Sequence, residues 1–431
     1  MGICLSAEAG EVPRAAELGL PRNFTVFKEL GAGGEGRTYL VRERLGNGRS
    51  ELFAAKVAPR GAGLDVGYLL QGIKNQCALS HVNIIRLLEV ILTHSHVIIK
   101  LEYAQGGELS DYIARQHAQS SSQQLSEEHA RFLFMQMLDA VAHCHERGIV
   151  HRDIKLSNVL LDSGKCPRVK VCDFGLSREL FTGDSRCCPP AGTPMYMPPE
   201  VLKNVVRRAH TQHDPVKSDM WSLGVLLFTM LLGRFPFGAQ KPFGGPALSR
   251  GAGRLTRSQG NISAGAAGPR DFQRSDFRFL LRNMVKAHSS DLKRLRSETW
   301  GTRKLSPDCR DLMDGLLAMD PSKRLGLADA FAHKWVNGPL FLEHAQTIAR
   351  GREEMEKRQD EGEGVKGAKA GLEDDAELAA IAAMAAAVGT PGDELLRWTP
   401  PRERAGREQA GVADEELFDL PGGLRDRAIS I

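Results

Sequence analysis

Long apolar runs and an excess of charge of one sign are both absent from this 431-residue sequence. The longest apolar run is residues 220–232. A membrane-spanning helix needs about 20 residues, so this shorter run indicates a buried helix. The 57 basic and 53 acidic residues leave a net charge of only +4, which gives no global bias toward binding a polyanion. The composition therefore favours neither a membrane-spanning protein nor a nucleic-acid-binding one.

Metal-ligand spacing is also missing among the eight cysteines. They are scattered along the chain, and several fall in apolar or loop positions, as a reducing compartment permits. We therefore expect an intracellular, cytoplasmic protein. The C-terminal tail has no Asp-x-Asp-x-Asp-Gly loop, which excludes a calcium site of that kind.

What is present is an ordered set of motifs in the middle of the chain. His-Arg-Asp-Ile-Lys-Leu-Ser-Asn occupies residues 151–158, and Asp-Phe-Gly occupies residues 173–175. An isolated Asp-Phe-Gly is most simply explained as a turn. Here, however, a long apolar helix is predicted over residues 131–145 and short strands over residues 159–161 and 169–171. The motifs thus follow one another as helix, loop, strand pair and second loop.

The residue types in this stretch fit phosphoryl transfer. That chemistry needs a carboxylate to orient the attacking hydroxyl and oxygen ligands to hold magnesium on the phosphates. Asp153 is the candidate base that accepts the hydroxyl proton, and Lys155 is expected beside the γ-phosphate of ATP. Asn158 and Asp173 are the candidate ligands of Mg²⁺, a hard cation that favours oxygen. The sequence thus predicts ATP and Mg²⁺ as cofactors.

A glycine-rich stretch lies nearer the N-terminus, between strand-like runs at residues 24–29 and 39–42. Glycines let a backbone approach phosphates because no Cβ intervenes. The same spacing marks dinucleotide-binding folds, but there a helix follows, whereas here the chain returns to a strand and reaches Lys56 in another. The candidate ATP-binding residues of this region are Leu30, Gly31, Ala32, Gly33, Gly34, Glu35, Gly36, Arg37, Thr38 and Lys56.

Over residues 23–336 these motifs resemble the eukaryotic protein kinase family. A lysine two residues after the catalytic-loop aspartate is what the serine/threonine kinases of that family carry. Glu-Tyr-Ala-Gln-Gly-Gly-Glu-Leu at residues 102–109 and Pro-Arg-Val-Lys-Val-Cys at residues 167–172 further resemble the plant sucrose-non-fermenting-related kinases of the osmotic-stress branch. The AMP-activated and calmodulin-dependent kinases are more distantly similar. The resemblance implies a protein serine/threonine kinase that acts on protein substrates in stress or nutrient signalling.

The same resemblance implies an α+β, bilobal protein-kinase fold. A small β-rich N-lobe with one main helix would span residues 23–103, and a larger helical C-lobe would span residues 104–336. An insertion at about 238–274 is predicted to be disordered, because it is rich in Gly, Ala, Ser and Arg and has few large apolar residues to bury. The tail, residues 337–431, is predicted to be mostly disordered, with a helix at about 372–388 and a role in binding a regulatory partner.

Further site residues follow from the resemblance. Lys56 would join the catalytic residues by holding the phosphates. Glu102 and Ala104 would contact adenine in the hinge between the lobes. Glu108 would bind an arginine of the substrate, and Thr193 would bond the catalytic aspartate and lysine when the substrate groove is formed.

Two pairings are expected in the C-lobe. Asp219 would brace the backbone around Arg152, and Glu200 would pair with Arg324. An incidental match between surface charges is the alternative explanation for such a pair, and it would contribute little to stability.

Candidate modification sites lie at the N-terminus and in the segment from Asp173 to Glu200, which corresponds to the activation segment of kinases. Residues 1–22 form an N-terminal segment in which Gly2 fits the pattern for N-myristoylation and Cys4 that for palmitoylation. Two acyl chains would give stable peripheral membrane attachment, whereas one would not. The alternative is an unmodified start of the chain. Thr182 and Ser185 are the candidate phosphorylation sites.

The sequence departs from the kinase pattern in the predicted N-lobe. Glu35 stands where an aromatic residue usually covers the phosphates, and Thr38 where a valine usually packs on adenine. No acidic residue occurs between Asp65 and Glu89, so Gly72 occupies the helix position at which relatives carry the glutamate that pairs with the phosphate-binding lysine. A shifted alignment, with Asp65 or another group serving that lysine, is the alternative. These departures keep a second hypothesis open: a catalytically weak kinase-like scaffold that binds nucleotide or partner proteins.

Overall fold

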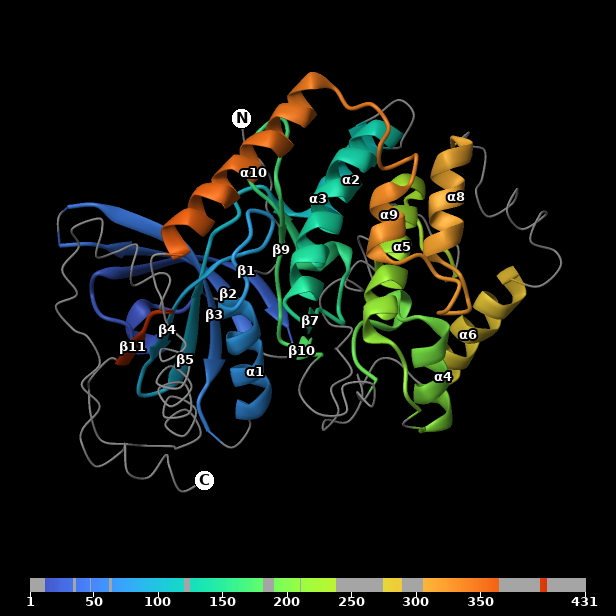
Figure 1. Ribbon diagram of the computed structural model, residues 1–431. Helices are drawn as coiled ribbons and strands as arrows, with labels where there is room; N and C mark the ends of the chain where they lie inside the picture. The colour runs from blue at the N-terminus through green and yellow to red at the C-terminus, as the bar shows by residue number, and fades with distance from the viewer. Residues whose placement is uncertain are drawn as a thin grey trace. The chain divides into compact units, whose positions relative to one another are not determined.

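The computed structural model describes ten segments of the chain: residues 12–33, 36–46, 48–61, 64–119, 125–180, 190–209, 211–237, 274–288, 305–363 and 396–400. These residues confirm the predicted α+β fold, with a β-rich unit and a helical unit (Figure 1). The small unit draws its described residues from 1–73, 86–103 and 359–431, and the large unit draws its own from 74–85 and 104–358.

One antiparallel sheet forms the centre of the small unit. Its strand order is β1-β2-β3-β5-β4-β11. Phe53, Val41, Ile91 and Ile98 have no exposed surface and form its core together with Leu18. The strands are β1 (Phe24–Gly33), β2 (Gly36–Arg44), β3 (Ser50–Pro59), β4 (Leu87–Leu92), β5 (His96–Leu101) and β11 (Leu396–Trp398), with the short helix η1 (Ala15–Leu18) before them.

The main helix expected after β3 is α1 (Val66–Cys77). Helix α1 carries no carboxylate, and Gly72 lies within it, as expected from the sequence. A glycine inside a helix costs about 1 kcal/mol relative to alanine, because its backbone has more freedom to lose.

The large unit is built around α3 (Glu127–Glu146) and α5 (Pro215–Leu232). Almost all of α5 is buried, which confirms the buried helix predicted for residues 220–232. Asp214 caps its N-terminus by accepting hydrogen bonds from the first N–H groups, and Gly233 ends it with φ of 64°. The other elements are α2 (Leu109–Gln119), α4 (Pro199–Arg207), α6 (Arg274–His288), α8 (Pro307–Leu316), α9 (Leu327–Ala332), α10 (Leu342–Glu363), β6 (Gly107–Glu108), β7 (Ile149–Val150), β8 (Val159–Leu161), β9 (Val169–Val171), β10 (Arg178–Glu179), η2 (Leu156–Asn158) and η4 (Pro194–Tyr196).

Two segments of the tail after residue 336 belong to the folded units, an arrangement that the sequence did not predict. Helix α10 packs on the large unit: the ring of His344 stacks on Phe132 with centroids 4.2 Å apart, and Glu354 pairs with Arg168 at 2.5 Å. Strand β11 joins the sheet of the small unit. Neither segment has a strong apolar pattern of its own, so the contacts that order them cannot be read from local sequence.

Several predictions concern residues outside the described segments. They include residues 238–273 of the insertion, whose last predicted residue, Arg274, begins α6, and the tail helix at 372–388. The same holds for Gly34 and Glu35 of the glycine-rich stretch and for the modification sites Gly2, Cys4, Thr182 and Ser185. Among the helices that the structure does describe, none combines the length and apolarity needed to cross a membrane.

Candidate active site

The glycine-rich stretch forms the β1–β2 hairpin of the small unit. Ala32 pairs with Arg37 and Gly33 with Gly36, which confirms that the chain passes from strand to strand. Gly36 has φ of 133°, and a Cβ at this position would lie 2.2 Å from the carbonyl oxygen of Val57. Only glycine fits there. The return to a strand excludes the dinucleotide-binding alternative, in which a helix would follow.

The neighbouring candidate residues lie on strands β1, β2 and β3. Residues 30–32 are the last part of β1 before the hairpin turn. Lys56 of β3 pairs in register with Thr38 of β2. Arg37 forms an exposed ion pair with Glu29 at 2.9 Å, which joins the two strands of the hairpin. The lysine and the glycine-rich turn are therefore held by one continuous sheet.

The predicted hinge and substrate residues are held by backbone and side-chain hydrogen bonds. The backbone N–H of Glu102 donates to the carbonyl of Arg86 at 2.9 Å, and the N–H of Arg86 donates to the Glu102 carboxylate at 3.2 Å. Ala104 is 7% exposed. Glu108 of β6 accepts a hydrogen bond from the hydroxyl of Ser110 at 2.8 Å, which orients its carboxylate.

Asp153 is the centre of a hydrogen-bonded cluster in the large unit. Its Oδ1 accepts from the hydroxyl of Thr193 at 2.7 Å, and its Oδ2 accepts from Lys155 Nζ at 2.6 Å and from Asn158 Nδ2 at 3.0 Å. Lys155 Nζ also donates to Thr193 Oγ1 at 3.0 Å. This confirms the contacts predicted for Thr193. Residues from the catalytic loop and the activation segment, some 40 positions apart in the chain, meet on one carboxylate.

Lys155 carries its positive charge in this cluster. Burial lowers the pKa of its ammonium group, but the negative charges of Asp153 and Asp173 outweigh burial and raise the pKa above the ordinary value. The lysine therefore stays protonated throughout the physiological pH range. A fixed cation beside two carboxylates is suited to bind a phosphate that arrives with a metal ion.

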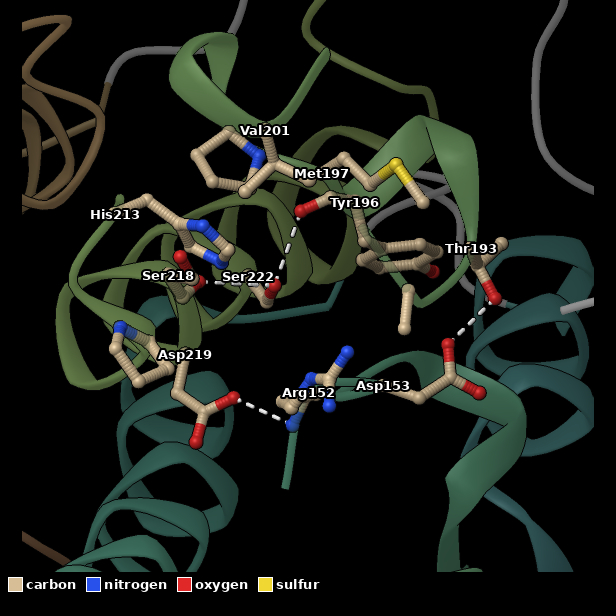
Figure 2. Close-up of a pocket in the computed structure, with 13 residues that line it drawn as sticks. Arg152, Asp153, Thr193, Tyr196, Met197, Val201, His213, Ser218, Asp219 and Ser222 are labelled. Atoms are coloured by element: carbon tan, nitrogen blue, oxygen red, sulfur yellow. Dashed lines mark hydrogen bonds between the residues drawn. The ribbon is translucent and has the colours of Figure 1, made fainter. Parts of the chain in front are cut away.

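Asp219 braces the backbone of the catalytic loop, as predicted. Its two carboxylate oxygens accept from the backbone N–H groups of His151 at 3.0 Å and Arg152 at 2.9 Å, and Figure 2 shows the bond to Arg152. Burial raises the pKa of Asp219, but the hydrogen bond and charge of His145, whose Nε2 lies 2.8 Å away, help to lower it below the ordinary value. Its contribution to stability is therefore complete at neutral pH and is lost as the pH falls through the lowered pKa.

The loop that Asp219 braces has an unusual backbone. Arg152 and Asp173 both have positive φ, at 68° and 67°, a region that residues other than glycine seldom occupy. Gly192 approaches this loop so closely that a Cβ there would lie 2.5 Å from the carbonyl oxygen of Arg152. The ring of His151 packs against Phe174 with centroids 4.9 Å apart. Such strained conformations persist where surrounding contacts hold them and are concentrated at functional sites.

Asn158 and Asp173 fit the predicted Mg²⁺ site by their chemistry. The Asn158 amide nitrogen donates to both the carbonyl and the carboxylate of Asp153, so its amide oxygen is turned toward other partners. An amide oxygen and a carboxylate are both ligands that Mg²⁺ favours, and phosphates usually complete its shell. Among the described residues, no group of three or more His, Cys, Asp or Glu side chains is arranged to hold a metal ion.

A small cavity lies beneath the catalytic loop, with Arg152, Thr193, Tyr196, His213 and Asp219 among its lining residues (Figure 2). Its free volume of about 20 Å³ is room for about one water molecule. The cavity is therefore too small to bind a nucleotide or a peptide side chain, and we assign it a packing role under the activation segment.

Glu200 and Arg324 form the predicted pair, and it is not an incidental surface match. The guanidinium group donates two parallel hydrogen bonds to the carboxylate, at 2.8 and 3.0 Å. Arg324 is only 1% exposed, donates to the carbonyl of Lys217 at 2.7 Å and lies over the ring of Trp221 at 5.0 Å. This arginine thus ties α4, α5 and the segment after α8 together.

One buried connection was not foreseen from the sequence. Near the end of α1, the Asn75 side chain donates to the hydroxyl of Ser177 at 2.7 Å, and Ser177 donates to the carbonyl of Phe174 at 2.5 Å. The two side chains are 1% and 0% exposed. They are neutral, common residue types 102 positions apart, so no motif marks them. In the large unit this connection couples the end of α1 to the Asp-Phe-Gly segment.

Comparison with known protein families shows to which family this chain belongs. The protein kinase domain family matches residues 24–336. The chain therefore belongs to the protein kinase family, as its sequence predicted.

Particular relatives narrow the class. The chain is 34% identical over 316 residues to serine/threonine-protein kinase SAPK3 of Oryza sativa subsp. indica, which covers 73% of this chain and 78% of the relative. It is 32% identical over 327 residues to serine/threonine-protein kinase SRK2E of Arabidopsis thaliana, covering 75% of each. SRK2C of the same plant is 34% identical over 312 residues, 72% of this chain and 75% of the relative. These similarities confirm the resemblance to the plant osmotic-stress kinases and the predicted enzyme class, a protein serine/threonine kinase.

Proposed function

We propose that this kinase transfers the γ-phosphoryl group of ATP to serine and threonine hydroxyls of protein substrates, in stress or nutrient signalling. The observation that carries the proposal is the cluster in which Lys155, Asn158 and Thr193 all donate to Asp153. The plant relatives, all named as serine/threonine-protein kinases, support the class of acceptor. ATP would supply the phosphoryl group, and Mg²⁺ would neutralise charge on its phosphates.

Each residue of the cluster has a distinct task in this proposal. Asp153 orients the substrate hydroxyl and accepts its proton, because its carboxylate is fixed by three donors. Lys155 stays protonated and places a positive charge where negative charge develops. Asn158 and Asp173 supply oxygen ligands for the metal, and Lys56 of β3 holds phosphates from the small unit. Catalysis then rests on positioning and charge rather than on covalent chemistry.

A transfer assay tests the proposal directly. Purified full-length protein is incubated with radiolabelled ATP, Mg²⁺ and three peptides that differ only in having Ser, Thr or Tyr at one position. We expect label on the serine and threonine peptides, with serine preferred, because the large apolar Leu176 follows the Asp-Phe-Gly motif, as in kinases that favour serine. Chelating Mg²⁺ should abolish transfer. Absence of transfer to all three peptides would contradict the proposal and support the scaffold alternative.

Glu108 is expected to select an arginine three residues before the acceptor. Its carboxylate is oriented by Ser110, and in related kinases this position contacts such an arginine. Glu108→Gln should reduce the preference for arginine over alanine in a positional peptide library by about tenfold, the effect of about 1.4 kcal/mol of lost charge interaction. Asp111→Asn, an exposed carboxylate at the start of α2, is the matched control and should keep the preference. An unchanged library profile for Glu108→Gln would show that another group reads the arginine.

A further inference from the structure

Strand β11 is a piece of the tail that completes the sheet of the small unit. It pairs antiparallel with β4, with Leu396 opposite Leu92, Arg397 opposite Ile91 and Trp398 opposite Val90. Figure 1 shows it in red at the edge of the sheet, next to β4. Among the described strands β11 is the outermost on this side, so without it β4 would be the sheet edge and would present unpaired backbone groups.

Two buried carboxylates lie within reach of Arg397 of the tail strand: Glu89 of β4 and Glu43 of β2. Glu43 and Glu89 are 2% and 1% exposed. Lys100, itself fully buried, donates to Glu43 at 2.8 Å and to the more exposed Glu51 at 2.9 Å, while Glu89 lies 3.7 Å from it. Arg397 supplies the second cation: its guanidinium group donates to Glu43 at 2.9 Å and twice to Glu89, once at 2.8 Å.

Arg397 and Trp398 fit this edge in different ways. Burial raises the pKa of Glu43, but Lys100 and Arg397 outweigh burial and lower it, so the carboxylate is charged and needs both cations. Arg397 also lies over the ring of Phe24 at 5.7 Å. Trp398 is 1% exposed, among the largest fully buried side chains of the described residues. A forked cation and a large aromatic side chain are the residue types that usually anchor a peptide in its site.

We propose that the edge of β4, together with Glu43 and Glu89, is a peptide-binding site for an extended Arg-Trp segment, and that the chain fills it with its own residues 396–398. Recognition combines addition of a strand to the sheet edge with a bidentate grip on a buried carboxylate. Residues 364–395 connect this strand to α10 and lie outside the described segments. The site therefore binds a segment of its own chain, which a connection of 32 residues joins to α10.

Occupancy of this site bears on the rest of the small unit. Strand β4 pairs with β5, and β5 in turn pairs with β3, the strand that carries Lys56. If Arg397 leaves, the buried carboxylates of Glu43 and Glu89 lose the cation that donates to both of them, and buried carboxylates that lose a partner destabilise a fold. The tail strand is thus expected to hold the phosphate-binding sheet together from its far edge.

In a full-length Arg397→Ala/Trp398→Ala variant, the tail can no longer fill the site. We call this double variant the host, because it leaves the site open to an added peptide. The probe is a fluorescent synthetic peptide with the sequence of residues 393–401, Asp-Glu-Leu-Leu-Arg-Trp-Thr-Pro-Pro. We expect fluorescence anisotropy to show saturable binding to the double variant and at least about tenfold weaker binding to the wild type, whose site is occupied. The double variant should melt about 5 °C or more below the wild type, and excess peptide should restore part of that difference.

Matched changes on both sides of the contact identify the recognition. A peptide with Ala in place of Arg397 should bind the host at least about tenfold more weakly, and this difference should shrink when the host also carries Glu89→Gln. Arg310→Ala removes an exposed arginine from α8 of the large unit and controls for the loss of a positive charge. Its melting temperature should equal that of the wild type, and it should not bind the peptide.

Equal binding of the peptide to wild type and double variant, or equal binding of the Arg and Ala peptides to the host, would overturn the proposal. If the double variant does not fold, full-length Arg397→Lys provides the same test, because it keeps the charge and loses the fork. The peptide should then raise the melting temperature of Arg397→Lys and leave that of the wild type unchanged. No rise in that host would equally overturn the proposal. Peptide binding requires no phosphoryl transfer, so the result is independent of the assay of kinase activity.

Discussion

Asp153→Asn is expected to lower kcat by about 10²–10⁴-fold, the range that a positioned general base contributes. The substitution keeps the size of the side chain and one oxygen acceptor, but the amide cannot take the substrate proton. It also removes the negative charge that helps to keep the pKa of Lys155 high. The KM for ATP should change little by comparison. Steady-state kinetics at several pH values, beside a thermal melt, measure both effects.

The role of Asp173, the second acidic residue of the site, is best tested by Asp173→Asn rather than by Asp173→Ala. Asp173 has φ of 67°, and asparagine adopts this conformation more readily than alanine does, so the backbone is preserved while the charge is lost. We expect kcat to fall as severely as in Asp153→Asn, with a higher requirement for Mg²⁺. Asp162→Asn, a carboxylate that pairs with Arg168 beside the β8–β9 hairpin, is the control and should keep full transfer. Wild-type transfer by either active-site variant would refute the role assigned to that residue.

Arg324→Ala is expected to destabilise the protein more than any surface change of charge. It leaves the Glu200 carboxylate, whose side chain is 17% exposed, without its bidentate partner and removes a buried cation from the ring of Trp221. Breaking a buried pair by removing one partner costs about 3–5 kcal/mol, which corresponds to a fall in melting temperature of about 5–8 °C for a domain of this size. Differential scanning fluorimetry at neutral pH measures the shift.

Two companion variants separate charge from geometry at this site. Arg324→Lys keeps the charge and loses the fork, so its melting temperature should lie between those of Arg324→Ala and the wild type. Arg310→Ala removes an exposed arginine from α8 and should melt with the wild type. If Arg324→Ala melted no lower than Arg310→Ala, the buried pair would have no net effect on stability.

The catalytic loop shows how much of the site could be predicted from the sequence. Its motif is local, since the residues that act together lie within a few positions, and the chemistry of Asp153, Lys155 and Asn158 needs those residue types at that spacing. The partners Thr193 and Asp219 lie 40 and 66 positions further on, yet their contacts were also predicted, because the resemblance to protein kinases implies them. The structure brings Lys155, Asn158 and Thr193 together on the Asp153 carboxylate. Asp219 holds the neighbouring backbone, at the N–H of Arg152.

The buried connections that carry no motif could not be found in this way. Asn75 and Ser177 meet only because α1 and the activation segment fold against each other in the large unit. His145 lies beside Asp219 for the same reason, since α3 and α5 pack together. A neutral polar residue has many possible partners in an unfolded chain, and only packing selects one of them.

The amino-acid sequence was enough to predict the family, the return to a strand after the glycine-rich stretch, the buried central helix α5 and the order of the residues that carry the chemistry. These features depend on local spacing and periodicity, which can be read directly from the chain. The packing of residues 342–363 as α10 and the addition of residues 396–398 to the sheet of the small unit could be found only in the folded protein. The tail strand is three residues long, which is too short for its pattern to predict a strand. It is ordered by hydrogen bonds to β4, by burial of Trp398 and by the buried carboxylates of Glu43 and Glu89, which lie more than 300 positions away in sequence.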